Sequence, residues 1–192
     1  MRRHRSIELV VVLLLALVAG ACRRYFPTTW PERLKQAEAV LVESGASAQE
    51  RFYVLPTAAK AAYELGQYDK AAEYANEALS LAPDFPDDWN YGNAMHDGHM
   101  VLGRLALHRG DLDAALRELA EAGETPGSPQ LYSFGPNMSL ANDLLARGQS
   151  AAVLEYFRRC ARFWHMGSDR LRSWTANVEA NQSPDFGANL FF

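Results

Sequence analysis

The fold is decided by the stretch Ala61-Ala62-Tyr63-Glu64-Leu65-Gly66-Gln67-Tyr68-Asp69-Lys70-Ala71-Ala72. Apolar residues recur with a helical period on both sides of its short polar turn. Gly66 stands where a helix ends, since glycine adopts the left-handed backbone conformation without the penalty of a Cβ atom. Ala71 is small enough for two helices to approach closely. The stretch therefore predicts two helices joined by a turn at Gly66.

The same plan recurs further along the chain. Residues 102–115 repeat it around Gly110, and residues 140–153 repeat it around Gly148. Ala115 takes the place of Ala71 in the second copy, whereas the larger Val153 occupies that place in the third. The sequence therefore predicts a chain of helix pairs, of which the third departs most from the common pattern.

These repeats resemble the tetratricopeptide repeat (TPR) family over roughly residues 52–164. The residues on the family's spacing are Gly66, Tyr68, Ala71, Ala75, Ala78, Leu79 and Pro83, then Leu102, Gly103, Gly110, Leu112, Ala115, Leu119 and Ala122. The resemblance implies an all-α fold, a right-handed superhelix of about three TPR-like antiparallel helix pairs. Flanking capping helices and long, aromatic-containing connections complete this expectation.

Helix-start signals place the flanking helices. Thr29 and Glu32 have the spacing of a capping box, in which each side chain bonds the other residue's backbone N–H. Ser47 and Glu50 repeat this signal before the first helix pair, and Ser168 precedes a final amphipathic stretch. We therefore expect one helix before the repeats and one after them.

The first residues have the character of an export signal. A basic start is followed by an uncharged apolar run from Leu9 to Ala19 and by small residues. The run Val18-Ala19-Gly20-Ala21-Cys22 resembles the lipobox of bacterial lipoproteins, which implies that Cys22 is acylated and becomes the first mature residue. Several acyl chains together give stable anchoring. The alternative is an uncleaved signal anchor.

This resemblance fixes the predicted domain organisation. We expect a signal peptide at 1–21, a linker at 22–30, a TPR-like helical domain at 31–181 and a C-terminal tail at 182–192. The chain would be anchored in the bacterial cell envelope by lipidated Cys22 and would face the periplasm. Arg23 rather than aspartate follows Cys22, so the outer membrane is favoured over the inner one.

Two connections and the tail carry more apolar surface than solvated loops require. Residues 83–92 and 123–137 are rich in turn residues and contain the aromatic residues Phe85, Trp89, Tyr91, Tyr132 and Phe134. These side chains are expected to fold back onto the helices, either as core or as the wall of a pocket. Residues 183–192 are expected to dock on the domain or to meet a partner.

A binding surface follows from aligning the repeats on their glycines. Lys60, Arg104 and Asn142 share one position, and Tyr63 and Leu107 share another. In the TPR family both positions lie on the first helix of each pair, which lines the concave groove. The resemblance thus implies a polar track for a carboxylate or peptide backbone, with Tyr63 as an aromatic wall. The alternative is that these residues pair with neighbouring carboxylates, namely Glu64, Asp97 and Asp143.

Motifs for catalysis are absent from the sequence. There is no Gly-x-Ser-x-Gly nucleophile and no phosphate-binding glycine pattern. A formal net charge of −4 argues against nucleic acid as a partner. His96 and His99 have a spacing that can bind one metal ion from a helix, but the sequence places no third ligand. We favour the alternative that they lie at a helix N-terminus and face water or a loop.

The sequence therefore predicts a membrane-tethered, protein- or peptide-binding scaffold in the cell envelope, without catalysis, cofactor or metal. Its partner would be an extracytoplasmic protein or peptide. The alternative is a small-molecule or metal-binding envelope protein that uses the aromatic loops and His96/His99.

Overall fold

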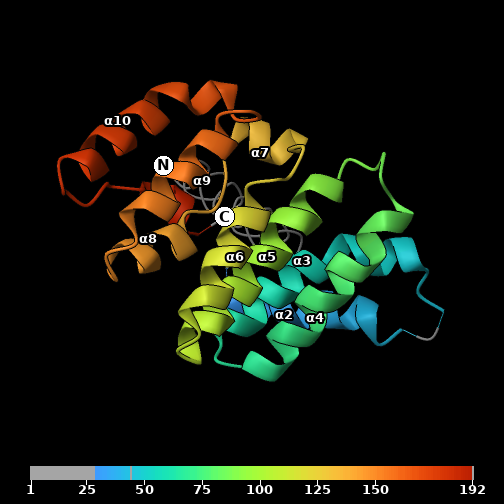
Figure 1. The fold of residues 1–192 in the computed structure, drawn as a ribbon. Coiled ribbons are helices and arrows are strands. Elements are labelled where there is room, and N and C mark those ends of the chain that lie inside the picture. Colours follow the sequence, from blue (N-terminus) through green and yellow to red (C-terminus); the bar gives the residue numbers. More distant parts are fainter. Residues whose placement is uncertain (1–28, 44, 192) are drawn as a thin grey trace, which may run out of the picture.

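The computed structural model describes residues 29–43 and 45–191, and these ranges are helical without any β-strand (Figure 1). The helices are α2 (Trp30–Leu41), α3 (Ala48–Glu64), α4 (Tyr68–Leu81), α5 (Tyr91–His108), α6 (Leu112–Ala122), α7 (Pro129–Ser133), α8 (Ser139–Leu145), α9 (Ser150–Cys160) and α10 (Ser168–Glu179). Short 3-10 turns, η1 (Ala82–Asp84), η2 (His165–Gly167) and η3 (Gly187–Leu190), lie between or after them. The all-α prediction is confirmed for these ranges.

The predicted signal peptide and Cys22 lie outside the described residues. Within those residues, no helix combines the length and the apolar character that crossing a membrane requires.

Three helix ends share one turn geometry. Gly66, Gly110 and Gly148 have φ angles of 72°, 80° and 75°, in the left-handed region. The N–H of the residue after each glycine donates to a carbonyl five residues back, at 2.9 to 3.0 Å. These bonds satisfy carbonyls that a helix end would leave unpaired. The helix ends predicted from the glycines are confirmed, and the superhelix of three repeat pairs stays a prediction.

The predicted helix starts are confirmed as well. The Ser47 and Glu50 side chains form a capping box, in which the Ser47 N–H donates to Glu50 Oε2 at 2.8 Å. Thr29 and Glu32 form the same arrangement at the start of α2. Helix α10 begins at Ser168 and buries the apolar residues Leu171, Trp174 and Val178.

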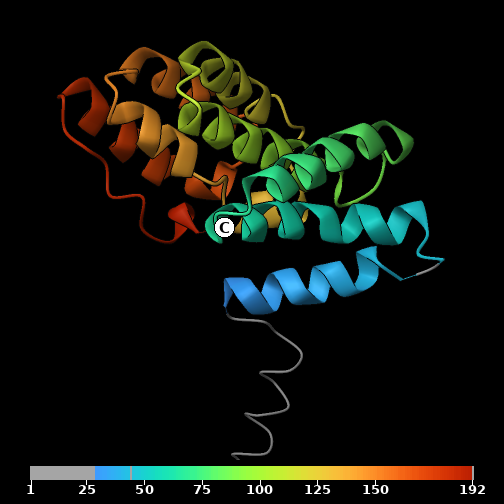
Figure 2. The same ribbon diagram turned by 90° about the horizontal axis from the view of Figure 1, so that it is seen from below.

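Small residues allow the helices to approach closely. Ala71 on α4 and Ala115 on α6 have no exposed surface, and Val153 occupies the equivalent buried place on α9. Helix α2 lies along α3, and α3 packs on α4 and α5 (Figure 2). The core between α2 and α5 consists largely of alanine, because these backbones lie close together.

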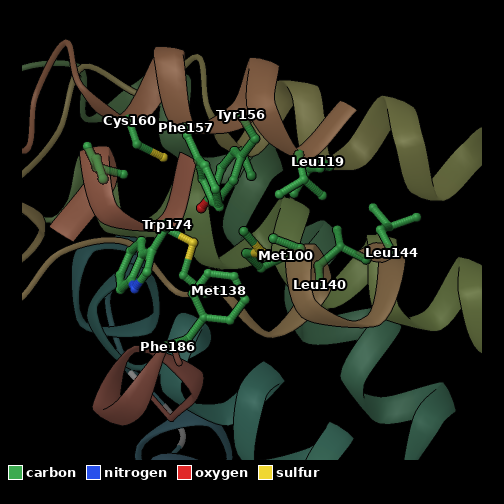
Figure 3. Close-up of a cluster of buried hydrophobic side chains, with 14 of the residues drawn as sticks. Met100, Leu119, Met138, Leu140, Leu144, Tyr156, Phe157, Cys160, Trp174 and Phe186 are labelled. Atoms are coloured by element: carbon green, nitrogen blue, oxygen red, sulfur yellow. The ribbon is translucent and has the colours of Figure 1, made fainter. Parts of the chain in front are cut away.

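A second core lies between α5 and the C-terminal helices and contains larger side chains. Figure 3 shows Tyr156 and Phe157 of α9, Trp174 of α10 and Phe186 of the tail in this cluster. The Trp174 and Phe186 rings pack edge to face with their centroids 5.0 Å apart. This core holds α8, α9, α10 and the tail to the end of α5.

Helix α3 contains a proline, Pro56, which leaves one backbone carbonyl of the helix without its usual donor. Pro56 has no N–H, so it cannot bond the carbonyl of Phe52 one turn earlier. The side chain of Asn90, which is 4% exposed, donates its Nδ2 to that carbonyl at 3.0 Å. The start of α5 is thereby fixed against the middle of α3.

The aromatic residues of the connections divide between the two expected roles. Phe85 stacks on the buried Phe52, with ring centroids 4.9 Å apart, and Tyr91 packs against the same cluster. Trp89 and Phe134 are 48% and 58% exposed and form part of the wall of a cavity. The second connection also contains α7, a short helix that the sequence analysis did not predict.

The tail docks on the domain. Asn189 is fully buried, and its Nδ2 donates to the carbonyls of Phe134 and Pro136 at 3.1 and 2.9 Å. The Met138 N–H donates to the Asn189 carbonyl at 2.7 Å. These bonds hold the loop between α7 and α8 in place, because residue Asn189 of the tail satisfies two backbone carbonyls and one backbone N–H of that loop.

Candidate functional site

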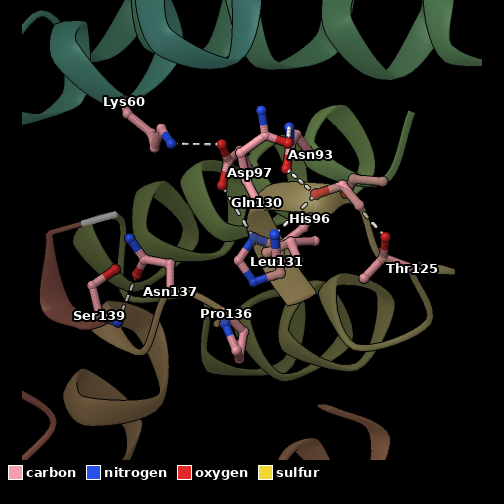
Figure 4. Close-up of polar contacts among 12 residues, drawn as sticks. Lys60, Asn93, His96, Asp97, Thr125, Gln130, Leu131, Pro136, Asn137 and Ser139 are labelled. Atoms are coloured by element: carbon pink, nitrogen blue, oxygen red, sulfur yellow. Dashed lines mark hydrogen bonds and ion pairs between the residues drawn. The ribbon is translucent and has the colours of Figure 1, made fainter. Parts of the chain in front are cut away.

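The candidate site is a cavity of about 310 Å³, lined by residues of α3, α5, α7 and the tail. Four aromatic side chains line it and form what we call the aromatic rim: Tyr53, Trp89, Phe134 and Phe191. Polar side chains line it as well and form what we call the floor: Lys60, Asn93, His96, Asp97 and Gln130. The floor residues converge from three helices (Figure 4).

The aromatic rim is unusually exposed for large apolar side chains. Phe191 is 64% exposed, more than Trp89 or Phe134. Tyr53 and Trp89 pack together with ring centroids 5.4 Å apart. The Tyr53 hydroxyl donates to Asp88 at 2.8 Å, and this bond raises the pKa of Tyr53, so the phenol stays protonated. The rim thus presents neutral rings.

An ion pair lies at the floor. The Lys60 ammonium is 2.6 Å from Asp97 Oδ2, and Asp97 is only 7% exposed. Burial alone would raise the pKa of Asp97, but the Lys60 charge and the hydrogen bond from His96 outweigh it and hold that pKa below its ordinary value. Asp97 therefore stays ionised next to its two partners.

A buried chain of polar contacts extends from this pair into the C-terminal core. His96 Nδ1 is 3.1 Å from Asp97 Oδ1, and His96 Nε2 is 3.0 Å from the Tyr156 hydroxyl. The Tyr156 hydroxyl donates to the Asn137 carbonyl at 2.9 Å. Because a carboxylate only accepts, Nδ1 of His96 carries a hydrogen. The chain connects α3, α5, α9 and the loop before α8.

The expectation that His96 faces water at a helix N-terminus is wrong. Helix α5 begins at Tyr91, so His96 lies in its second turn and has no exposed surface. His99 bonds a different carboxylate, Glu118, at 2.8 Å. The two imidazoles therefore do not converge on one ion. Within the described ranges, no group of three or more His, Cys, Asp or Glu residues is arranged to hold a metal.

Three of the five predicted binding residues lie at or beside the cavity. Lys60 is on its floor, and Tyr63 and Arg104 line a neighbouring space of about 20 Å³. Arg104 is 2.5 Å from Glu64 and 3.4 Å from Asp143, and its guanidinium lies 4.1 Å from the centroid of the Tyr63 ring. The carboxylate pairs that the sequence offered as the alternative are therefore present.

The other two predicted residues lie elsewhere. Leu107 is 8% exposed and belongs to the C-terminal core, because α8 packs against this end of α5 and covers it. Asn142 is exposed on α8 but lines neither space. These two residues therefore do not line the cavity, whose next wall is formed by α7 and the loop after it, and their part in partner binding stays a prediction.

Several site residues were missed by the sequence analysis. The Asn93 side chain donates to Gln130 at 3.1 Å and accepts from Ser128 at 2.6 Å, which ties α5 to α7. A Cβ atom at Gly92 would lie 1.8 Å from the Gly127 carbonyl oxygen, so only glycine permits this approach. In the sequence, only the aromatic residues of the two connections indicated that this region forms a site.

Comparison with known protein families identifies a tetratricopeptide repeat at residues 57–85. This range contains the second half of α3 and all of α4. No curated protein and no solved structure matches the chain. The repeat agrees with the resemblance drawn from Gly66, Ala71 and Pro83, and it includes Lys60 of the cavity floor.

Proposed function

We propose that this chain is a protein-interaction scaffold of the bacterial cell envelope, tethered to a membrane through acylated Cys22. Its aromatic rim would receive an extracytoplasmic protein or peptide. The repeat at residues 57–85 supports the scaffold role, since tetratricopeptide repeats generally mediate protein–protein interactions. The lipobox-like run ending at Cys22 supports the tether. The proposed lipoprotein faces the periplasm from the outer membrane.

The observation that carries the proposal is the aromatic rim over a cavity beside that repeat. Trp89, Phe134 and Phe191 leave about half or more of their surface in water and border one cavity. Aromatic residues that bury surface on contact supply much of the energy of protein interfaces. A cluster of exposed rings on a rigid helical support therefore suits docking better than solvation.

The floor supports binding rather than catalysis. Lys60, His96 and Asp97 bond to one another, and His96 also bonds Tyr156. Each group is thus engaged in holding helices together. A scaffold needs this rigidity because fixed surfaces lose less entropy when they bind.

The cavity itself favours a second candidate function, the binding of a small molecule. Its volume of about 310 Å³ falls at the lower end of the range of ordinary ligand sites. The aromatic loops line it, as that candidate requires. The metal version of this candidate is not supported, because His96 and His99 bond different carboxylates.

Affinity capture with matched variants tests the scaffold. The full chain, the double variant Trp89→Ala/Phe134→Ala and the control Tyr132→Ala are isolated from solubilised membranes, and co-purifying proteins are quantified. Tyr132 is a suitable control because it is an exposed aromatic residue that lines a different cavity. A partner retained by the control and lost by the double variant is the expected result. Identical protein sets from all three chains would contradict docking at the rim.

A further inference from the structure

We infer that the cavity binds an uncharged saccharide, with the flat face of a sugar ring on the aromatic rim and its hydroxyl groups on the floor. The inference develops the small-molecule candidate. It rests on that candidate alone, and a saccharide would compete with a docking protein for the same rim.

The charge of the floor selects an uncharged ligand. An anion bound at Lys60 would place a second negative charge beside the ionised Asp97, which is 7% exposed, and would share the same ammonium with it. A cation would compete with Lys60 and His96, which already hold the two oxygens of Asp97. Arg33, at the edge of the cavity, lies over the Trp30 ring at 4.8 Å. A neutral ligand leaves all these contacts in place.

Hydroxyl groups match the hydrogen-bonding capacity that remains on the floor. Lys60 has three ammonium hydrogens, and the Asp97 carboxylate can accept more bonds than the two it makes. Two adjacent hydroxyls donate and accept at once, so they can bridge this ammonium and carboxylate without separating them. The Gln130 amide, which also lines the cavity, adds a further donor and acceptor.

The rim supplies the apolar contact that a sugar ring needs. The C–H groups on one face of a pyranose pack on an aromatic ring, and the burial of this surface stabilises the complex. Trp89 offers one such ring, since it is 48% exposed and packs against Tyr53. Phe134 and Phe191 offer further exposed faces along the same cavity.

The shape of the cavity favours a compact ligand over an extended peptide. Its volume of about 310 Å³ lies at the lower end of the range of small-ligand sites. An extended chain advances about 3.3 Å per residue and needs an open channel. Beyond Lys60 the groove is filled by Tyr63, Glu64 and Arg104, where only about 20 Å³ remains. One or a few sugar units fit this limit.

Titration of the detergent-solubilised full chain with defined probes tests the inference. The neutral probes are N,N′-diacetylchitobiose and cellobiose, the anionic probe is glucuronic acid, and the peptide probe is acetyl-prolyl-phenylalanine amide. Tryptophan fluorescence reports contact at Trp89, and calorimetry gives the dissociation constant independently. The variants are Trp89→Ala and Gln130→Ala, with Tyr132→Ala as the control, and circular dichroism verifies that each is folded.

The inference predicts that a neutral disaccharide binds and that Trp89→Ala raises its dissociation constant by about tenfold. Tyr132→Ala leaves the constant unchanged, and raising the salt from about 0.05 M to about 0.5 M has little effect because no net charge is paired. The inference is overturned if neither disaccharide binds at about 10 mM, or if the control variant weakens binding as much as Trp89→Ala. Binding of the peptide probe alone would also overturn it, while leaving the scaffold function intact.

Discussion

At the floor of the cavity, the Asp97 carboxylate joins helices α3 and α5. Its two oxygens hold Lys60 of α3 and His96 of α5, and His96 in turn reaches Tyr156 of α9. A buried carboxylate is tolerated only where such partners compensate its lost hydration. The same side chain therefore supports the fold and sets the charge of the site.

The substitution Asp97→Asn should destabilise the protein by about 3 kcal/mol at neutral pH, since it leaves Lys60 and His96 without their carboxylate. Urea unfolding measures this change. The exposed Asp113 on α6 provides a control, and Asp113→Asn should change the unfolding free energy by less than about 0.5 kcal/mol. Equal effects of the two substitutions would contradict the role given to the ion pair.

The pH dependence of this difference follows from the lowered pKa of Asp97 in the folded protein. A lowered folded pKa adds stability that is fully present above the unfolded pKa of about 3.9 and disappears as the pH falls through the folded value. The gap between wild type and Asp97→Asn should therefore be largest near neutral pH and narrow below about pH 4. A gap that persists unchanged into acid would show that Asp97 is not held ionised by its partners.

At the scale of the elements, helix α3 depends on a contact from outside the helix. Pro56 leaves the Phe52 carbonyl without its helical donor, and Asn90 supplies one from the start of α5. This hydrogen bond fixes α3, which carries Tyr53 and Lys60, relative to α5, which carries Asp97. The cavity is thus positioned by a bond that neither helix could make alone.

A double-mutant cycle tests this contact. Asn90→Ala should cost about 1–3 kcal/mol of unfolding free energy, because a buried carbonyl loses its partner. The cost should fall by about 1 kcal/mol in the Pro56→Ala background, where the new backbone N–H can bond the Phe52 carbonyl within the helix. Strictly additive effects in thermal or urea unfolding would mean that the two residues are not coupled.

Local signals made the helices predictable. The turns at Gly66, Gly110 and Gly148 and the capping boxes at Thr29 and Ser47 each depend on residues a few positions apart. These local signals therefore located the starts of α2 and α3 and the ends of α3, α5 and α8.

The cavity was less predictable because its contacts join distant parts of the chain. Asn90 bonds Phe52, and Asn189 bonds Phe134, across long separations in sequence. The repeat register led to Lys60, which lines the cavity, and to Leu107, which is 8% exposed and packs in the C-terminal core. Periodicity gives the face of a helix and cannot show which neighbour will cover that face.

At the scale of the molecule, two cores meet along α5. The alanine-rich core joins α2 to α5, and the larger core joins α5 to α10 and the tail. The cavity lies where α3, α5, α7 and the tail come together, so parts of both halves line it. The helical body can hold this surface in one shape while the proposed acylated Cys22 holds the body at a membrane.

The proposed tether makes a prediction about location. Cys22→Ser removes the thiol that acylation requires, so in cells that export the chain it should move from the membrane fraction to the soluble fraction, or remain as an unprocessed precursor. Cys160→Ser is the matched control, because Cys160 is fully buried in α9 and its pKa is raised by that burial. Unchanged membrane fractionation and processing of Cys22→Ser would contradict lipid anchoring.

The central claim is that the aromatic rim is the working surface of this scaffold, and photo-crosslinking in living cells tests it most directly. A photoreactive phenylalanine analogue replaces Trp89, Phe134 or, as the control, Tyr132, and the adducts are identified by mass spectrometry. The account predicts a discrete adduct with the same partner from Trp89 and Phe134 and none of it from Tyr132. No adduct from either rim position, or the same adducts from all three, would contradict it.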